Sequence, residues 1–158
     1  MNMKRYIKRD IGSGNSIFTV LDELGSELYK AEKHKNGIVL LSNDGEKLLK
    51  IKALHLPKLC AYSITDRNNN IKFFMNPQKR SCYFYGTAWQ VRGDVFSKSF
   101  DIIDADNSLV CAHEKSFSNG RSCYLVTVEK DYNELLCLGT ALCVESLAHS
   151  DNLCVQTV

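Results

Sequence analysis

Hydrophobic and polar residues alternate along most of this chain, in short runs separated by residues that form turns. In residues 49–53 the apolar side chains fall on one face and both lysines on the other, and residues 124–128 alternate in the same way. Alternation over a short run predicts a strand with one buried and one solvated face. We therefore expect a sheet of many short strands with one hydrophobic surface.

A repeat of 22 residues organises these runs, because Asp22, Asp44 and Asp66 are evenly spaced and each stands between two apolar runs. Asp104 marks a fourth copy. An apolar run, a polar turn and a second run predict a β-hairpin, and Asn-Asp-Gly at 43–45 is the strongest turn signal. With further strands expected at residues 4–9, 82–91 and 122–129, the total is eleven or twelve. Such hairpins close most economically into a barrel, since closure removes exposed edges.

Residues 134–148 break this pattern, because they predict a helix without a polar face. No charged residue lies between Leu135 and Val144. A helix that is apolar around its whole circumference must be enclosed by protein or by lipid. This uncharged stretch has ten residues, whereas a membrane-spanning helix needs about 20. We expect the helix to fill the barrel, with Gly139 and Ala141 allowing close approach to the wall. The predicted fold class is therefore mainly β, a closed barrel of about twelve mostly antiparallel strands around a central hydrophobic C-terminal helix.

Length and composition fit one folded unit, with 158 residues of which 44% are hydrophobic and 24% charged. We expect a single domain over residues 1–158, because no linker divides the chain. The first ten residues contain no apolar segment typical of an export signal. Seven cysteines, odd in number and scattered, favour reduced and mostly buried thiols. These features predict a cytoplasmic protein, with peripheral association at a membrane as a further possibility.

The net charge of +2 argues against binding of nucleic acid through bulk charge. Positive charge is concentrated toward the N-terminus, where residues 1–58 contain eleven lysines and arginines against seven aspartates and glutamates. Much of it occurs in pairs, and lysines 33 and 35 form one such pair. The other pairs give the candidate residues for binding anionic lipid headgroups: Lys4, Arg5, Lys8, Arg9, Lys50, Lys52, Lys79 and Arg80. Several basic side chains on one surface would attract anionic headgroups.

Motifs for catalysis, metals and cofactors are missing from the sequence. There is no Gly-x-Ser-x-Gly motif, and no motif pairs a histidine with a cysteine or serine. Asp104 and Asp106 could begin a calcium loop, but the required glycine and glutamate are replaced by Leu109 and Lys115. Cys111 and His113 share a strand face without a second pair of metal ligands. We therefore predict no catalytic residues, no metal site and no cofactor.

The order of several segments resembles the LURP-one-related proteins. The segments are Tyr6-Ile-Lys, Trp89-Gln-Val-Arg-Gly-Asp, Phe100-Asp-Ile-Ile-Asp and Tyr124-x-Val-x-Val followed by the apolar helix. The resemblance runs from about Tyr6 to Leu147. It groups the chain with Tubby C-terminal-like domains and phospholipid scramblases, and implies a twelve-stranded barrel around a central hydrophobic helix.

Two functional hypotheses follow from this resemblance. Tubby domains bind phosphatidylinositol bisphosphate through basic residues on the barrel exterior, including a Lys-x-basic pair, and Lys50-Ile-Lys52 has that spacing. The first hypothesis is a non-enzymatic binding or scaffolding module that binds anionic phospholipid or phosphoinositide headgroups at a membrane surface. The second is a soluble domain that binds a protein partner or a small ligand and has no lipid role.

Overall fold

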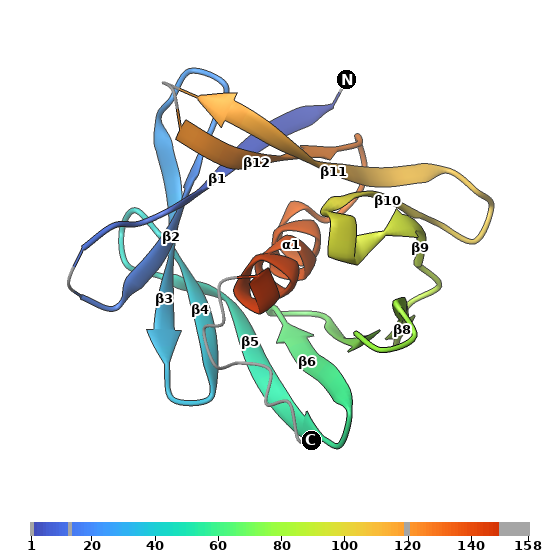
Figure 1. The fold of residues 1–158 in the computed structure, drawn as a ribbon. Helices are drawn as coiled ribbons and strands as arrows, with labels where there is room; N and C mark the ends of the chain where they lie inside the picture. The colour runs from blue at the N-terminus through green and yellow to red at the C-terminus, as the bar shows by residue number, and fades with distance from the viewer. Residues whose placement is uncertain (1, 13, 119–120, 149–158) are drawn as a thin grey trace.

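Twelve strands and one long helix make up the computed structural model, which describes residues 2–12, 14–118 and 121–148. The strands are β1 (Met3–Arg9), β2 (Ser16–Leu21), β3 (Glu27–His34), β4 (Gly37–Ser42), β5 (Lys47–Leu56), β6 (Leu59–Thr65), β7 (Asn70–Asn76), β8 (Ser81–Tyr85), β9 (Gln90–Asp94), β10 (Ser99–Ile103), β11 (Leu109–Ser118) and β12 (Arg121–Val128). A short 3-10 helix, η1 (Val95–Ser97), precedes β10, and the helix α1 (Glu134–Ala148) follows β12. The sheet curls around α1 (Figure 1).

The strands form one antiparallel sheet in the order β8-β7-β6-β5-β4-β3-β2-β1-β12-β11-β10-β9. Pairing of β1 with β12, in which Met3 lies opposite Val128, joins the first and last strands. The two edges of the sheet, β8 and β9, are consecutive in the chain, so the barrel is nearly closed. The predicted barrel of about twelve strands with a helix inside is confirmed.

The inward-facing side chains of the strands and the side chains of α1 together fill the interior. On β5, Leu49, Ile51 and Ala53 are buried and Lys50 and Lys52 are exposed, as predicted. On α1, Leu138 and Leu142 are fully buried. A Cβ atom at Gly139 would lie 2.7 Å from Ile64 Cγ2 and 2.9 Å from Leu49 Cδ2, which confirms the predicted close approach to the wall. The helix is too short to cross a bilayer, and no described helix meets that requirement.

The start of α1 is fixed to the barrel by Asn133. Its side-chain oxygen accepts a hydrogen bond from the backbone N–H of Leu136 at 3.0 Å, which caps the helix. Its side-chain amide donates to Asp66 Oδ2 at 3.0 Å. The helix therefore begins beside the turn between β6 and β7.

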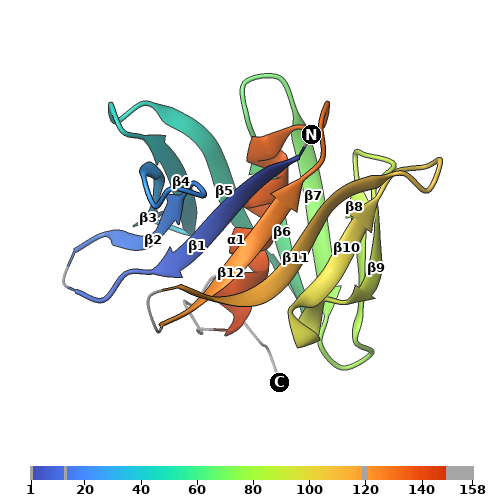
Figure 2. The same ribbon diagram turned by 90° about the horizontal axis from the view of Figure 1, so that it is seen from above.

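Connections alternate between two ends of the barrel because consecutive strands are antiparallel. We call these the upper end and the lower end, as they lie in Figure 2. The upper end contains the β2–β3, β4–β5, β6–β7 and β10–β11 turns and the start of α1. The β1–β2, β3–β4, β5–β6, β7–β8 and β9–β10 connections lie at the lower end, where α1 finishes.

The cysteines are mostly buried, as predicted. Free thiols occur at Cys82, Cys111, Cys123, Cys137 and Cys143, and burial raises the pKa of the Cys143 thiol well above its ordinary value. Cys60, on the inner face of β6, is disulfide-bonded. The prediction that the cysteines are reduced is therefore wrong for Cys60, and Cys154 lies outside the described residues.

Candidate functional site: a basic groove beside strand β5

A groove of about 910 Å³ runs along β5 on the outside of the barrel and reaches the start of α1. We call it the β5 groove. Its lining residues are His34, Lys35, Val39, Glu46, Lys47, Leu48, Leu49, Lys50, Thr65, Asp66, Arg67, Asn68, Asn69, Asn133 and Leu135. A smaller recess of about 230 Å³ shares His34, Lys35 and Lys50 with it and adds Lys52. This recess continues the basic surface toward the lower end.

Packing of β4 against β5 brings these residues together. Val39 lies opposite Lys50, and Gly37 lies opposite Lys52. A Cβ atom at Gly37 would be only 1.9 Å from the backbone oxygen of Ile51, so only glycine fits here. This close approach sets the β3–β4 turn directly beside the outward-facing lysines of β5.

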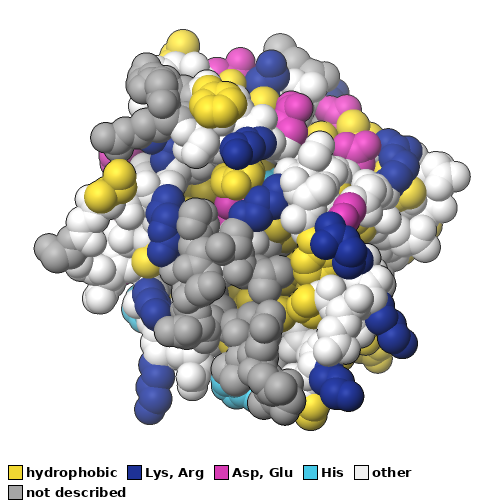
Figure 3. Space-filling model, viewed as in Figure 1, with side chains coloured by type: hydrophobic (Ala, Val, Ile, Leu, Met, Phe, Trp, Pro, Cys, Tyr) yellow, Lys and Arg dark blue, Asp and Glu magenta, His cyan; other side chains and the backbone are white. Residues whose placement is uncertain are grey.

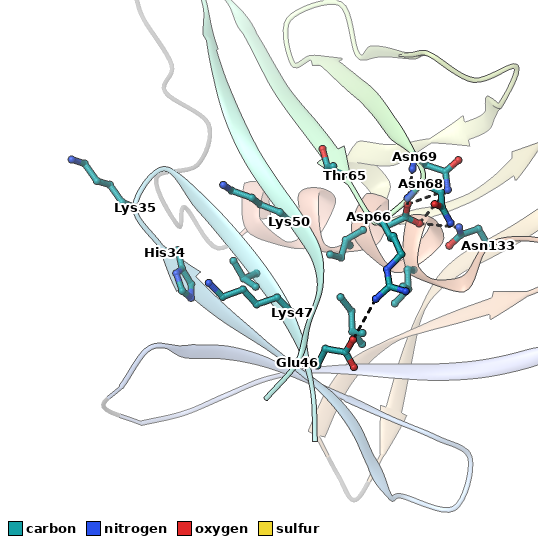
Figure 4. A pocket seen from close by; sticks show the side chains of 15 residues that line it. His34, Lys35, Glu46, Lys47, Lys50, Thr65, Asp66, Asn68, Asn69 and Asn133 are labelled. Atoms are coloured by element: carbon teal, nitrogen blue, oxygen red, sulfur yellow. Dashed lines mark hydrogen bonds and ion pairs between the residues drawn. The ribbon is translucent and has the colours of Figure 1, made fainter. Parts of the chain in front are cut away.

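Three lysines form the cationic part of the groove. Lys35, Lys47 and Lys50 are exposed, and none of them has a carboxylate within 4 Å among the described residues. Figure 4 shows Lys47 and Lys50 extending from β5 toward the β3–β4 turn, where His34 and Lys35 lie. His34 is itself exposed, with Nε2 3.8 Å from Glu32 Oε1. Like charges that share a groove without a counterion favour an anionic ligand between them.

The opposite part of the groove is polar, and its carboxylate is already satisfied. Asp66 Oδ1 accepts hydrogen bonds from the backbone N–H groups of Asn68 and Asn69, at 2.9 and 2.7 Å. Partial burial opposes ionisation of Asp66, but these bonds and the one from Asn133 outweigh it, so the pKa of the carboxyl lies below its ordinary value. A satisfied carboxylate competes weakly for the nearby lysines. Arg67 lies 3.9 Å from Glu46 in an exposed pair, which contributes little to stability.

Beyond the groove, the most unusual charged group is buried inside the lower half of the barrel. Glu145 of α1 is fully buried, with Oε1 3.4 Å from Lys98 Nζ and Oε2 3.4 Å from His113 Nε2. The ring of His113 stacks on Phe100 and Tyr124, at centroid distances of 4.7 and 5.4 Å. This cluster connects the last turns of α1 to β11 and to the β9–β10 connection, and no pattern in the sequence indicated it.

The structure does not assemble a metal site from Cys111 and His113. His113 faces Glu145, whereas Cys111 forms a hydrogen bond with the Cys137 thiol. This bond, together with burial, raises the pKa of Cys137. Among the described residues, no three histidines, cysteines, aspartates or glutamates lie close enough to hold a metal ion.

The predicted basic residues of β1 are divided between the two faces of the strand. Arg5 points inward, and its Nε atom is 2.6 Å from Glu134 Oε2. Tyr29 also donates to that oxygen at 3.1 Å, and burial with the Glu134 charge raises the pKa of Tyr29 to about 12. Lys4 and Lys8 lie on the outer face of β1. Strands β2, β3 and β4 separate them from β5, so they do not join Lys50 and Lys52.

The remaining predicted residues lie at the lower end. Arg9 ends β1, with its guanidinium carbon 5.5 Å from the centre of the Phe18 ring. Lys79 and Arg80 occupy the β7–β8 turn, and Arg80 is ion-paired with Asp94. Only Lys50 and Lys52 of the eight candidates therefore line the β5 groove or its recess.

Sequence reasoning left His34, Lys35, Lys47 and Arg67 out of the candidate site. The position of Lys35 could have been predicted from the sequence. The hairpin centred on Asn-Asp-Gly at 43–45 pairs the start of β4, which follows Lys35, with the middle of β5. That register places the β3–β4 turn beside Lys52. The other residues come together through the curvature of the sheet, and the pairing of β4 with β5 shifts register between Leu40 and Leu41.

Comparisons with known proteins agree with this architecture. A sequence model of the LURP-one-related family matches residues 3–145. The crystal structure of a protein from Arabidopsis thaliana superposes with a TM-score of 0.65 and 14% sequence identity, covering 93% of this chain and 91% of that chain. At this identity the likeness concerns the fold alone. No curated relative matches the sequence. Because the family match spans nearly the whole barrel and its helix, the chain belongs to the LURP-one-related family.

Proposed function

We propose that this chain is a non-enzymatic binding module, and that the β5 groove holds the phosphorylated headgroup of an anionic phospholipid. The observation that carries the proposal is the set of three exposed lysines, Lys35, Lys47 and Lys50, which share one groove without carboxylate partners among the described residues. The protein would then act as a peripheral module at the cytoplasmic surface of a membrane.

The size and chemistry of the groove support a headgroup as the ligand. Its volume of about 910 Å³ is within the range of small-molecule sites, about 300 to 1,000 Å³. Lysine ammonium groups bind phosphate as mobile point charges, so they adapt to more than one phosphate position. The amide side chains of Asn68 and Asn133 line the polar part of the groove, beside Thr65. Polar side chains of this kind suit the hydroxyl groups of a sugar or inositol ring.

Vesicle sedimentation tests the proposal. Wild-type protein should sediment with phosphatidylcholine vesicles that contain a phosphoinositide and stay in solution with phosphatidylcholine alone. Reversing two groove charges, with Lys47→Glu and Lys50→Glu, should weaken binding by at least about tenfold, since each lysine near an anionic surface contributes about 1 kcal/mol. The matched control, Lys4→Glu with Lys130→Glu, makes the same change of charge away from the groove and should bind like wild type.

A soluble inositol phosphate distinguishes two ligands that carry the same phosphate groups: a lipid headgroup in a membrane and a free small molecule. Competition of this compound with vesicles, lost in the groove variant, would support the headgroup proposal. Binding of the soluble compound without any binding to vesicles would identify a small-ligand protein instead. If neither is bound even at low salt, the headgroup proposal is wrong, and the protein-interaction hypothesis becomes the better account.

A further inference from the structure

Charge is divided between the two ends of the barrel. Three turns at the upper end each carry two carboxylates: Asp22 with Glu23, Asp44 with Glu46, and Asp104 with Asp106. Connections at the lower end instead carry Lys35, Lys58, Lys79 and Arg80. This end also holds Asp10 and Asp94, and Asp94 is ion-paired with Arg80. Figure 3 shows the lower end face-on, with dark-blue lysine and arginine side chains on every side and the magenta acidic side chains mainly in the upper part of the view.

Among the described residues, three large hydrophobic side chains are exposed at this same end, and one in the upper-end turns, Leu24, is 91% exposed. Ile11, in the β1–β2 connection, is 82% exposed, and Phe117, near the end of β11, is 73% exposed. Leu56, at the β5–β6 hairpin, is 39% exposed. Single exposed hydrophobic residues are common on soluble proteins. Here, however, the β1–β2 and β11–β12 hairpins are neighbours, because β1 pairs with β12. Two of these side chains therefore lie on adjacent hairpins, and the next hairpin, β3–β4, carries Lys35.

Two of the basic residues occupy strained turn positions. Lys58 and Arg80 have φ angles of 64° and 51°, a left-handed conformation that glycine adopts with less strain. In the hairpin turns of the upper end, the positions with positive φ are held by Gly25 and Gly45 in the β2–β3 and β4–β5 turns and by Asn107 in the β10–β11 turn. At these two lower-end turns the chain therefore carries a basic side chain where glycine would fit.

We propose that the lower end of the barrel is the face that docks on an anionic bilayer, with Ile11 and Phe117 inserted among the headgroups and the basic turns contacting lipid phosphates. This inference rests on the proposed function and adds the orientation in which the protein meets the membrane. Exposed apolar side chains surrounded by lysine and arginine are the combination by which peripheral proteins bind such surfaces.

The length of the barrel keeps the acidic turns from cancelling this attraction. Strands of five to ten residues, at about 3.3 Å a residue, hold the two ends roughly 15 Å apart or more. Charges are screened over about 8 Å at physiological ionic strength. The bilayer therefore interacts with the basic end, and the acidic end is repelled, so the approach of the protein is oriented.

The β5 groove fits this orientation. His34 and Lys35 line the groove and belong to the β3–β4 turn and its flank at the lower end. With that end on the bilayer, only the His34 and Lys35 end of the groove faces the lipid, because Lys47 and the polar part lie toward the upper end. A headgroup that reaches Lys50 must therefore extend from the membrane plane along β5. The groove would then select the lipid, and the lower end would supply attraction that depends on surface charge alone.

Vesicles of phosphatidylcholine and phosphatidylserine, without phosphoinositide, test the docking face separately from the groove. Ile11→Ser with Phe117→Ser should weaken binding about tenfold because apolar burial is lost. Lys58→Gly with Lys79→Glu should weaken it by a similar factor, and glycine suits the turn at residue 58. The controls are Leu24→Ser, at an exposed upper-end leucine, and Lys130→Gly with Lys4→Glu. Both should bind like wild type and melt at the same temperature.

Insertion itself can be measured with a tryptophan at the tip. Phe117→Trp should become quenched by brominated lipid on binding, whereas Leu24→Trp should not. Equal quenching at both positions would contradict the proposed docking face. So would unchanged vesicle binding by the Ile11→Ser, Phe117→Ser variant and the Lys58→Gly, Lys79→Glu variant. If those variants still bind soluble inositol phosphate, the groove proposal stands independently. If the protein binds RNA through these basic residues and does not bind vesicles, that result would also contradict a membrane partner.

Discussion

The lysines of the β5 groove and Lys98 are the same residue type in opposite surroundings. Lys98 lies 3.4 Å from the buried carboxylate of Glu145 and beside the ring of Tyr124, so its charge is used within the fold. Lys47 and Lys50 face solvent, and no carboxylate lies within 4 Å of them among the described residues. The comparison teaches that the partner of a charge, more than its presence, decides whether it stabilises the protein or binds a ligand.

The interior should be far more sensitive to charge than the groove. Leu138→Asp would place a carboxylate in a fully buried part of α1, which costs several kcal/mol against a total stability of about 5 to 15 kcal/mol. We expect this variant to be unfolded, as measured by circular dichroism and thermal melting. A cooperative melt close to that of wild type would contradict the central position of the helix.

Removing the buried carboxylate should cost less, but still a large fraction of the stability. Glu145→Ala leaves His113 and Lys98 without this partner, and we expect a loss of about 3 kcal/mol in urea unfolding. Glu145→Gln keeps the shape and a hydrogen-bonding group, so its loss should be smaller. If both variants unfold like wild type, Glu145 does not hold the end of α1 to the wall.

A substitution in the close-packed backbone beneath the groove should reduce stability by an intermediate amount. Gly37→Ala would bring a methyl group against the backbone of Ile51, where flexible side-chain movement cannot relieve the contact. We expect a loss of about 2 kcal/mol, together with weaker headgroup binding because the β3–β4 turn must shift. Asn36→Gly, in the same turn, is the comparison: Asn36 has a φ of 65°, which glycine adopts without strain, so this change adds no contact, and an equal loss there would contradict the packing argument.

The polar part of the groove should show a small dependence on pH. Because the folded-state pKa of Asp66 lies below the ordinary value of 3.8, its contribution to stability is complete above that value and is lost as pH falls through the folded-state pKa. Asp66→Asn should therefore reduce stability near neutral pH more than near pH 3, as measured by urea unfolding. An equal reduction at both values would mean that ionised Asp66 has no special role.

Much of the fold was predictable because it depends on local patterns. The evenly spaced turn aspartates marked three hairpins, and the uncharged run before Val144 marked the enclosed helix. The residues of the site were harder to predict. Adjacent residues of a strand point to opposite faces, so Arg5 faces inward where Lys4 faces out, and a basic pair in sequence is not a pair on the surface. The meeting of Lys35, Lys47 and Lys50 depends on sheet curvature, and the alternation of residues does not encode it.

The central claim is that the β5 groove binds a phosphorylated headgroup. Its most direct test is a titration of the intact protein with a soluble inositol phosphate, followed residue by residue through backbone amide NMR signals. The account predicts saturable shifts in residues 34–36, 47–52 and 66–69, which surround the groove, and their loss in the Lys47→Glu, Lys50→Glu variant. Shifts confined to β1 around Lys4 and Lys8, or no saturable shift anywhere, would contradict it.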